Sequence, residues 1–226
     1  MKISFQPRLV AISDASTRGA AHTVARFGEL AEAAAPGSLC VQLRDPDLSG
    51  ASKLELGRKL AALCRIHGQW LSVNDRLDLA LELGAHALHL PEQGIATSEA
   101  RRLFARQRRR VAISRACHDP SALPRVDADA VIVSPALQAR KGRAALGLAP
   151  MRALAEALGK RADAPRLVAL GGVEPRDASA LLAAGCHGVA VQGAAYEADV
   201  TALLRALGCL RRLGAESSAG EAPSGP

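Results

Sequence analysis

Aromatic side chains are scarce in this chain and make up only 2% of its 226 residues. Proteins that bind single-stranded nucleic acid without sequence preference stack bases on exposed rings, so the composition disfavours that class. Hydrophobic residues still make up 49% of the chain. We therefore expect one sizeable core built from Leu, Val and Ala.

Long apolar runs are also missing. No stretch approaches the ~20 residues of a membrane-spanning helix, and the N-terminal MKISFQPRLVAIS lacks the apolar segment of a secretion signal. The cysteines are odd in number, widely spaced and without a CxxC pair, which predicts reduced, buried thiols and no zinc site. They are Cys40, Cys64, Cys117, Cys186 and Cys209. We expect a cytoplasmic protein without a membrane partner.

The positive charge has one dense cluster. The formal net charge is +7, and RRLFARQRRR, residues 101–110, carries much of it. This segment could attract phosphorylated ligands or nucleic acid, or it could be a solvated helix face whose cations complement the helix dipole. No recognition motif accompanies the charge, so we favour the solvated face and expect no nucleic-acid partner.

Residues 70–92 contain one complete strand, helix, strand unit. The apolar run 70–73 stops at Asn74 and Asp75, as in a buried strand whose carboxyl end carries polar groups into a cleft. Helical spacing follows over 76–83 and a second apolar run over 87–90. A helix between two such strands makes a right-handed crossover, which implies a parallel sheet.

This pattern recurs along the chain. Strands are predicted at 9–13, 39–43, 70–73, 87–90, 111–114, 130–133, 167–170 and 188–191. Helices are predicted at 19–33, 51–67, 76–83, 97–107, 150–158 and 196–207, with a short helical turn at 119–124. Eight strands alternating with seven or eight helices favour an α/β fold, a single (β/α)8 TIM barrel over residues 1–213.

Two further expectations concern the alternative fold and the C-terminus. An open doubly wound sheet would usually carry a Gly-rich fingerprint after its first strand, and DASTRG, residues 14–19, matches it poorly. Residues 214–226 are rich in Gly, Ala, Ser, Glu and Pro and are expected to form a disordered tail.

In a barrel of this kind the site lies at the carboxyl ends of the strands. That rule selects Arg44, Asn74, Asp75, Glu92, His118, Ser134, Gly171, Gly172, Gln192 and Gly193. Arg44 offers a fork for an oxyanion, Asp75 and Glu92 could hold a hard cation such as Mg2+, and the glycine turns offer backbone amides to phosphate. Asp75 could equally cap the following helix, and His118 could be a hydrogen-bonded structural residue.

Three segments resemble the thiamine-phosphate synthase family, which includes the related thiazole tautomerases. They are VQLRDPDLSG (41–50), VNDRLDLALELGAHALHL (73–90) and VALGGVEPRDASALLAAGCHGVAV (168–191), within a resemblance that covers about residues 9–210. The resemblance implies the same barrel and a Mg2+-dependent transferase. It would condense hydroxymethylpyrimidine diphosphate with thiazole phosphate, so its partners would be small phosphorylated heterocycles.

The resemblance also implies roles for single residues. Gln42 would contact the pyrimidine, Arg44 and Asn74 the diphosphate, Asp75 the Mg2+, and Gly172 with the strand-eight turn the thiazole phosphate. The rest of the expected site consists of Lys141 as a catalytic residue, Glu92 as a second metal ligand, and Ser114, His118, Gly171, Gln192 and Gly193 as substrate-binding residues.

Several positions depart from the family pattern. Pro46 replaces a diphosphate-binding lysine, Gly94 a metal-binding aspartate and Ala116 a serine, while Lys141 is only approximately placed. These changes leave open a non-catalytic module that holds a phosphorylated ligand for a partner or for regulation, unless the cations of residues 140–143 compensate. The tautomerase branch is disfavoured, because Pro135 stands where its catalytic histidine would be. A homo-oligomer is possible, since an exposed Ala- and Leu-rich helix could pair.

Overall fold

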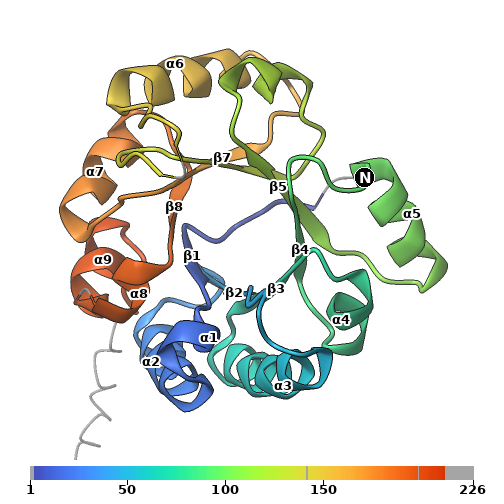
Figure 1. The fold of residues 1–226 in the computed structure, drawn as a ribbon. Coiled ribbons are helices and arrows are strands. Elements are labelled where there is room, and N and C mark those ends of the chain that lie inside the picture. The colour runs from blue at the N-terminus through green and yellow to red at the C-terminus, as the bar shows by residue number, and fades with distance from the viewer. Residues whose placement is uncertain (1–2, 141, 198, 212–226) are drawn as a thin grey trace, which may run out of the picture.

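The computed structural model describes residues 3–140, 142–197 and 199–211. Eight parallel strands form a closed barrel in chain order, and helices surround it (Figure 1). The strands are β1 (Leu9–Ile12), β2 (Leu39–Leu43), β3 (Trp70–Asn74), β4 (Ala87–Leu90), β5 (Ala112–Cys117), β6 (Ala130–Val133), β7 (Arg166–Leu170) and β8 (Gly188–Val191). The predicted (β/α)8 barrel is confirmed, and the open sheet is wrong because β8 pairs with β1, with Leu9 opposite Val189.

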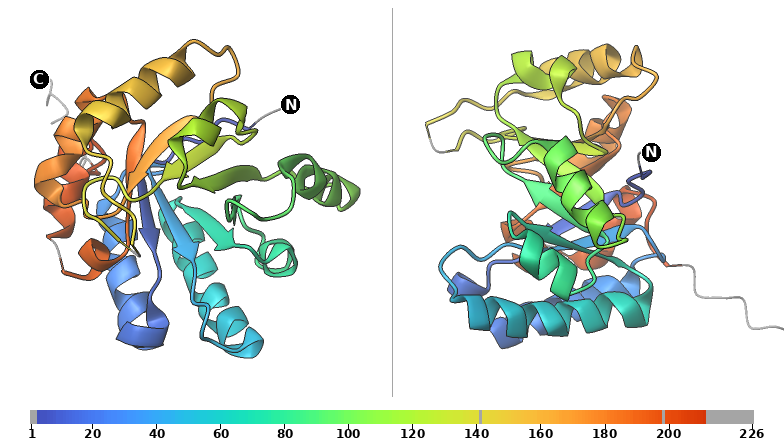
Figure 2. Two further views of the ribbon diagram at one scale, coloured as in Figure 1. Left: turned by 45° about the horizontal axis from the view of Figure 1, so that its top comes forward. Right: turned by 90° about the vertical axis from the view of Figure 1, so that its right-hand side faces the viewer.

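The helices cover the outside of the barrel. They are α1 (Ala15–Arg18), α2 (Ala20–Ala33), α3 (Gly50–His67), α4 (Leu77–Glu82), α5 (Thr97–Arg106), the 3-10 helix η1 (Pro120–Arg125), α6 (Leu148–Gly159), α7 (Pro175–Ala183), α8 (Gly193–Glu197) and α9 (Val200–Ala206). The loop near residue 140, yellow in Figure 2, extends from the end of the barrel opposite the N-terminus.

Three expected elements differ from the structure. The helix expected at 19–33 is preceded by a separate turn, α1, because Gly19 adopts a φ of 86° between the two. The helix expected at 196–207 is replaced by α8 and α9. Helix α7 was not among the predicted ranges, although Pro175 opens it and the Asp177 carboxylate accepts a hydrogen bond from the Glu174 amide at 2.9 Å.

Strand β5 runs three residues beyond its predicted end at 114. Arg115 interrupts the apolar pattern there, but its guanidinium donates hydrogen bonds to the carbonyls of Pro91 at 3.0 Å and Glu92 at 3.2 Å. A half-buried cation with its donors satisfied is tolerated inside a strand. The extension carries the chain up to His118.

Side chains alternate between two cores. Inward-facing strand residues are small or β-branched, as the narrow interior of an eight-stranded barrel requires, and Phe5, which precedes β1, packs against them. This inner core consists of Phe5, Val10, Ile12, Cys40, Ala87, Ala112, Ala130, Ile132, Val168 and Ala190. Leu, Val and Ala side chains of the other face pack against the helices, which confirms the composition expected of the core.

The remaining expectations have separate outcomes. No helix in the described ranges is long and apolar enough to cross a membrane. All five cysteines are buried and free, as predicted. The expected tail at 214–226 lies outside the described residues and stays a prediction.

The barrel seam depends on Gly188. A Cβ atom at this position would overlap the Arg8 carbonyl oxygen, with the Arg8 carbonyl carbon only 2.7 Å away. We expect Gly188→Ala to lower the free energy of unfolding by about 3 kcal/mol, because backbone must shift to admit the methyl group. Gly28→Ala is the control: its methyl would meet Leu63 at an ordinary 3.6 Å, and the better helix propensity should add about 0.5–1 kcal/mol. Urea denaturation of both variants measures the difference, and equal stabilities would contradict it.

Candidate active site

A cavity of about 270 Å³ occupies the mouth of the barrel at the carboxyl ends of the strands. Residues from seven strands, and Gln192 directly after the eighth, line it. The structure thus brings together six of the predicted strand-end residues, which are Arg44, Asn74, His118, Ser134, Gly171 and Gln192. Its polar lining consists of Gln42, Arg44, Asn74, His89, His118, Ser134, Arg140, Arg143 and Gln192. Cationic and amide groups outnumber carboxylates in this lining, which favours anionic ligands.

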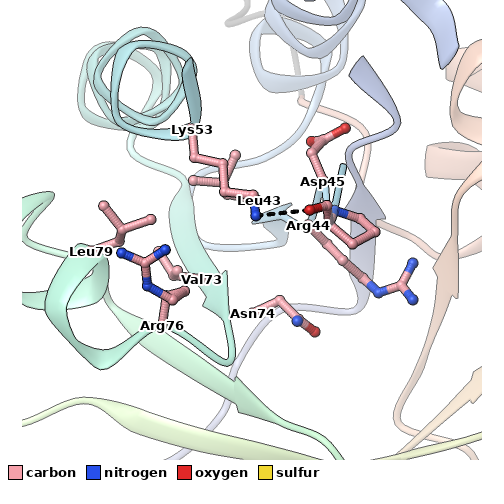
Figure 3. Close-up of a pocket in the computed structure, with 9 residues that line it drawn as sticks. Leu43, Arg44, Asp45, Lys53, Val73, Asn74, Arg76 and Leu79 are labelled. Atoms are coloured by element: carbon pink, nitrogen blue, oxygen red, sulfur yellow. Dashed lines mark hydrogen bonds between the residues drawn. The ribbon is translucent and has the colours of Figure 1, made fainter. Parts of the chain in front are cut away.

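The end of β2 presents Gln42 and Arg44. Asp45, which is buried, holds this end in place: its carboxylate accepts hydrogen bonds from the Ser13 hydroxyl and, at 3.0 Å, from the Ser16 amide. The Ser13 hydroxyl in turn accepts the Arg44 amide at 2.8 Å. The Arg44 side chain points away from Asp45 (Figure 3). The guanidinium is therefore presented on a fixed backbone and forms no ion pair with a described residue.

The end of β3 places Asn74 in the cavity wall, and Asp75, the next residue, is exposed and does not line the cavity. Asp75 has a φ of 55°, and its amide donates to the His89 carbonyl at 2.9 Å. The capping interpretation of Asp75 is wrong, because α4 begins after Arg76 without a side-chain cap. The exposed Asp75 carboxylate forms no hydrogen bond or ion pair with another described residue. Strained backbone of this kind is concentrated at functional sites.

The floor of the cavity contains His89, which the sequence analysis did not place in the site. It is buried, and its Nδ1 lies 2.9 Å from the Ser114 hydroxyl. Burial, followed by the charges of Arg44 and Arg115, lowers the pKa of His89 to about 3. The ring is thus neutral near pH 7. The signal in the sequence was alternation, since His89 shares its strand face with the inward-facing Ala87.

Ser114 and His118 have different surroundings. Ser114 is buried below the cavity lining, so its expected contact with substrate becomes support for His89 instead. Ala116, the next inward residue, lines the cavity without a polar group. The His118 ring lines the cavity and its Nδ1 lies 2.9 Å from the Ser134 carbonyl oxygen. A carbonyl only accepts, so Nδ1 carries a proton in this contact.

Glu92 is partly committed to the backbone. Its Oε1 accepts the amides of His118 at 2.7 Å and Asp119 at 3.2 Å, which joins the loops after β4 and β5. An aspartate at position 94 would require a local shift, because a Cβ on Gly94 would lie 2.9 Å from the Pro91 ring. In the described part of the chain no group of three or more His, Cys, Asp or Glu side chains is arranged to hold a metal.

Mg2+ still matches the donor set. This ion is usually held by one or two carboxylates together with substrate phosphates and water. The Asp75 carboxylate is accessible and without a protein partner, and Glu92 has one oxygen that accepts no hydrogen bond from the described residues. These two residues are the candidates to hold the ion beside a phosphorylated substrate.

The glycine turns after β7 and β8 line a second cavity of about 500 Å³. It adjoins the central cavity, since Arg140, Gly171 and Gln192 line both. Gly171 and Gly172 have φ values of 107° and 70°. Among the described residues, no group accepts a hydrogen bond from the amides of Gly172 and Gly193. Free amides at these two loops form a typical phosphate site of barrel enzymes.

The absence of a side chain at Gly172 also lets the loop after β6 approach the glycine turn. A Cβ at position 172 would lie 2.8 Å from the Gln138 nitrogen, and the Gly171 carbonyl accepts the Leu137 amide at 2.9 Å. Farther along this loop, Arg140 and Arg143 exchange two backbone hydrogen bonds of 3.0 Å, and both line the central cavity. Lys141, the expected catalytic lysine, lies outside the described residues.

The low pKa of His89 predicts acid sensitivity. Between about pH 6.5 and pH 3 the unfolded chain binds one proton that the folded chain does not, so stability should fall with decreasing pH by up to about 1.4 kcal/mol per unit. We expect His89→Asn to reduce this slope. His22→Asn, at an exposed position on α2, should keep the wild-type slope. Urea midpoints measured from pH 7 to pH 4 provide the comparison, and parallel curves for all three proteins would contradict it.

Comparison with known proteins identifies relatives over most of the chain. Residues 9–195 match the family model described as thiamine monophosphate synthase. The thiamine-phosphate synthase of Moorella thermoacetica is 34% identical over 180 residues, which cover 77% of this chain and 83% of that protein. The Thermus thermophilus enzyme of the same name is 35% identical over 171 residues, 74% of this chain and 79% of its own length.

A solved structure supports the fold. Thiamine phosphate pyrophosphorylase from Pyrococcus furiosus superimposes with a TM-score of 0.72 at 22% identity, covering 89% of this chain and 95% of its own. At that identity the likeness concerns the fold alone. The family match and the relatives above 30% identity decide the assignment: this chain belongs to the thiamine monophosphate synthase family.

Proposed function

We propose that this protein is a thiamine-phosphate synthase, which condenses hydroxymethylpyrimidine diphosphate with thiazole phosphate to give thiamine phosphate and diphosphate. One observation carries the proposal. Two adjoining cavities, which share Gly171 and Gln192 in their walls, carry Arg44 and Asn74 at one end and the glycine-turn amides at the other. Two phosphorylated substrates can therefore bind from opposite sides and meet in the middle. The names of the relatives support the same reaction.

The proposed binding roles follow the lining. Arg44 and Asn74 bind the diphosphate. Gln42, which lies on β2 two residues before Arg44, contacts the pyrimidine deeper in the cavity. The amides of Gly172 and Gly193 hold the thiazole phosphate, with Gly171 allowing the close approach of the backbone. Gln192 lines both cavities, so it contacts the heterocycles where they meet.

In the reaction, the bond between the pyrimidine methylene carbon and the diphosphate oxygen breaks. The electron pair leaves with the diphosphate, and the thiazole nitrogen forms the new bond to that carbon. Arg44 stabilises the charge that develops on the leaving group, while Arg140 and Arg143 add positive potential from above the cavity. His89 is neutral at this pH, so the floor does not repel a pyrimidine that becomes cationic.

Mg2+ is the proposed cofactor, held by Asp75 with Glu92. When bound, it would neutralise part of the diphosphate charge. The Asp75 side chain serves this role because it directly follows Asn74 in the chain and has no competing partner among the described residues. Glu92 contributes the oxygen that is not bonded to the loop after β5.

The alternatives are less well supported. A non-catalytic binding module was suggested by Pro46, Gly94 and Ala116, but relatives named as synthases match over most of the chain, which favours the enzyme. Pro135 lines the cavity and has no group that transfers a proton, so a tautomerase using that position is disfavoured. A cytoplasmic location agrees with five free thiols and remains part of the proposal, as does a homo-oligomer.

Incubation of the purified protein with both heterocycles and Mg2+ tests the proposal, with thiamine phosphate detected chromatographically. We expect product from the wild type and a loss of at least about 100-fold in kcat/KM for Asp75→Asn, because that is the effect of removing about 2.7 kcal/mol of transition-state stabilisation. Asp47→Asn, an exposed carboxylate near the same end of the barrel, should retain activity. Absence of product with the wild type would contradict the synthase, and full activity of Asp75→Asn would remove Asp75 from the metal site.

A further inference from the structure

A smaller pocket opens beside the central cavity, between the ends of β2 and β3 and the start of α3. It has a volume of about 90 Å³ and shares Arg44 and Asn74 with the central cavity. Lys53 and Arg76 add two further cationic side chains to its wall (Figure 3). This volume equals that of about three waters in the liquid, which suits one phosphoryl group. We call it the Lys53 pocket.

Lys53 is fixed in the first turn of α3. Its amide donates to the Ser49 carbonyl at 2.9 Å, and the Ser49 hydroxyl caps the helix by accepting the Ser52 amide at 3.1 Å. The half-buried side chain extends from this turn to the loop after β2, where its Nζ lies 3.2 Å from the Pro46 carbonyl oxygen. The ammonium group is thus directed at the pocket by an ordered helix start.

The charge of Lys53 is not neutralised by a described carboxylate. Its partner, the Pro46 carbonyl, is uncharged, and the nearby Asp45 carboxylate is occupied by Ser13 and Ser16. Lys59, two turns farther along α3, shows the usual alternative: it is exposed and pairs with Glu55 at 2.8 Å. An ammonium without a counter-ion, at the end of a half-buried side chain, favours binding of an external anion.

Arg76 and Arg44, the other two cations of the pocket, differ in whether a carboxylate neutralises them. Arg76 donates two hydrogen bonds to the Asp78 carboxylate, so its charge is largely compensated. Arg44 forms no ion pair with a described residue, and it lines both the Lys53 pocket and the central cavity. An anion that extends from the central cavity would therefore meet Arg44 first and Lys53 second.

We propose that Lys53 is a binding residue for the outer phosphoryl group of the diphosphate, with Arg44 bridging the inner and outer phosphoryl groups. The inference rests on the proposed function, because it requires a substrate that carries a diphosphate. The cation for the outer phosphoryl group would then come from helix α3, which carries Lys53. It would not come from the loop after β2, which carries Pro46. The same contact holds the free diphosphate after the bond to carbon has broken.

Calorimetric titration with inorganic diphosphate in the presence of Mg2+ tests the role of Lys53. We expect Lys53→Met to weaken the Kd about 10-fold, the effect of losing about 1.4 kcal/mol from one charge-assisted contact. Lys59→Met should bind diphosphate as the wild type does, and Lys53→Arg should recover most of the affinity. Thiamine phosphate lacks a diphosphate, so its Kd should be the same for Lys53→Met and the wild type.

The outcomes separate this inference from the proposed function. Equal diphosphate affinities for wild type, Lys53→Met and Lys59→Met would overturn the role of Lys53, and product formation by the wild type would then leave the synthase proposal standing. A parallel loss of thiamine phosphate affinity in Lys53→Met would also overturn it, because the effect would not be specific to the outer phosphoryl group. Lys53-dependent diphosphate binding by a protein that forms no product would overturn the synthase and retain the anion site.

Discussion

Closure of the sheet by pairing β8 with β1 is the constraint on which the rest of the molecule depends. It brings residues from opposite ends of the chain into register, and it does so only because Gly188 leaves room for the Arg8 backbone. Closure also gathers the carboxyl ends of the strands around the mouth of the barrel. The polar residues that follow β2 and β3 are thereby brought to the same end as the glycine turns that follow β7 and β8. The position of the site is therefore a result of topology and does not depend on any single ligand residue.

The loops at the mouth of the barrel are held by polar contacts between residues that are far apart in the sequence. Asp45 ties the end of β2 to the chain after β1 through Ser13 and Ser16. Arg115 holds the loop after β4 by its carbonyls, and Glu92 holds the loop after β5 by its amides. Such preorganised loops reduce the conformational entropy that ligand binding would otherwise cost.

The sequence predicted the barrel and its strand ends well, because parallel strands buried on both faces leave uninterrupted apolar runs that stop at polar residues. It predicted less well which side chains line the cavity and which form hydrogen bonds below it. By their alternation in the sequence, Ser114 and Ala116 both point into the barrel. Only the structure shows that Ser114 supports His89 below the lining while Ala116 reaches the cavity. Lys53 carries no signal at all, since it lies on a helix and reaches the site across a loop.

The close approach of Gly172 to Gln138 joins the glycine turn after β7 to the loop after β6. The loop that carries Arg140 and Arg143 into the cavity wall keeps its present position because residue 172 has no side chain. In a relative with a methyl group there, the loop would have to shift although neither arginine had mutated. Inspection of ligand positions alone would classify such a relative as intact, so inheritance of activity in this family must be judged from packing residues as well.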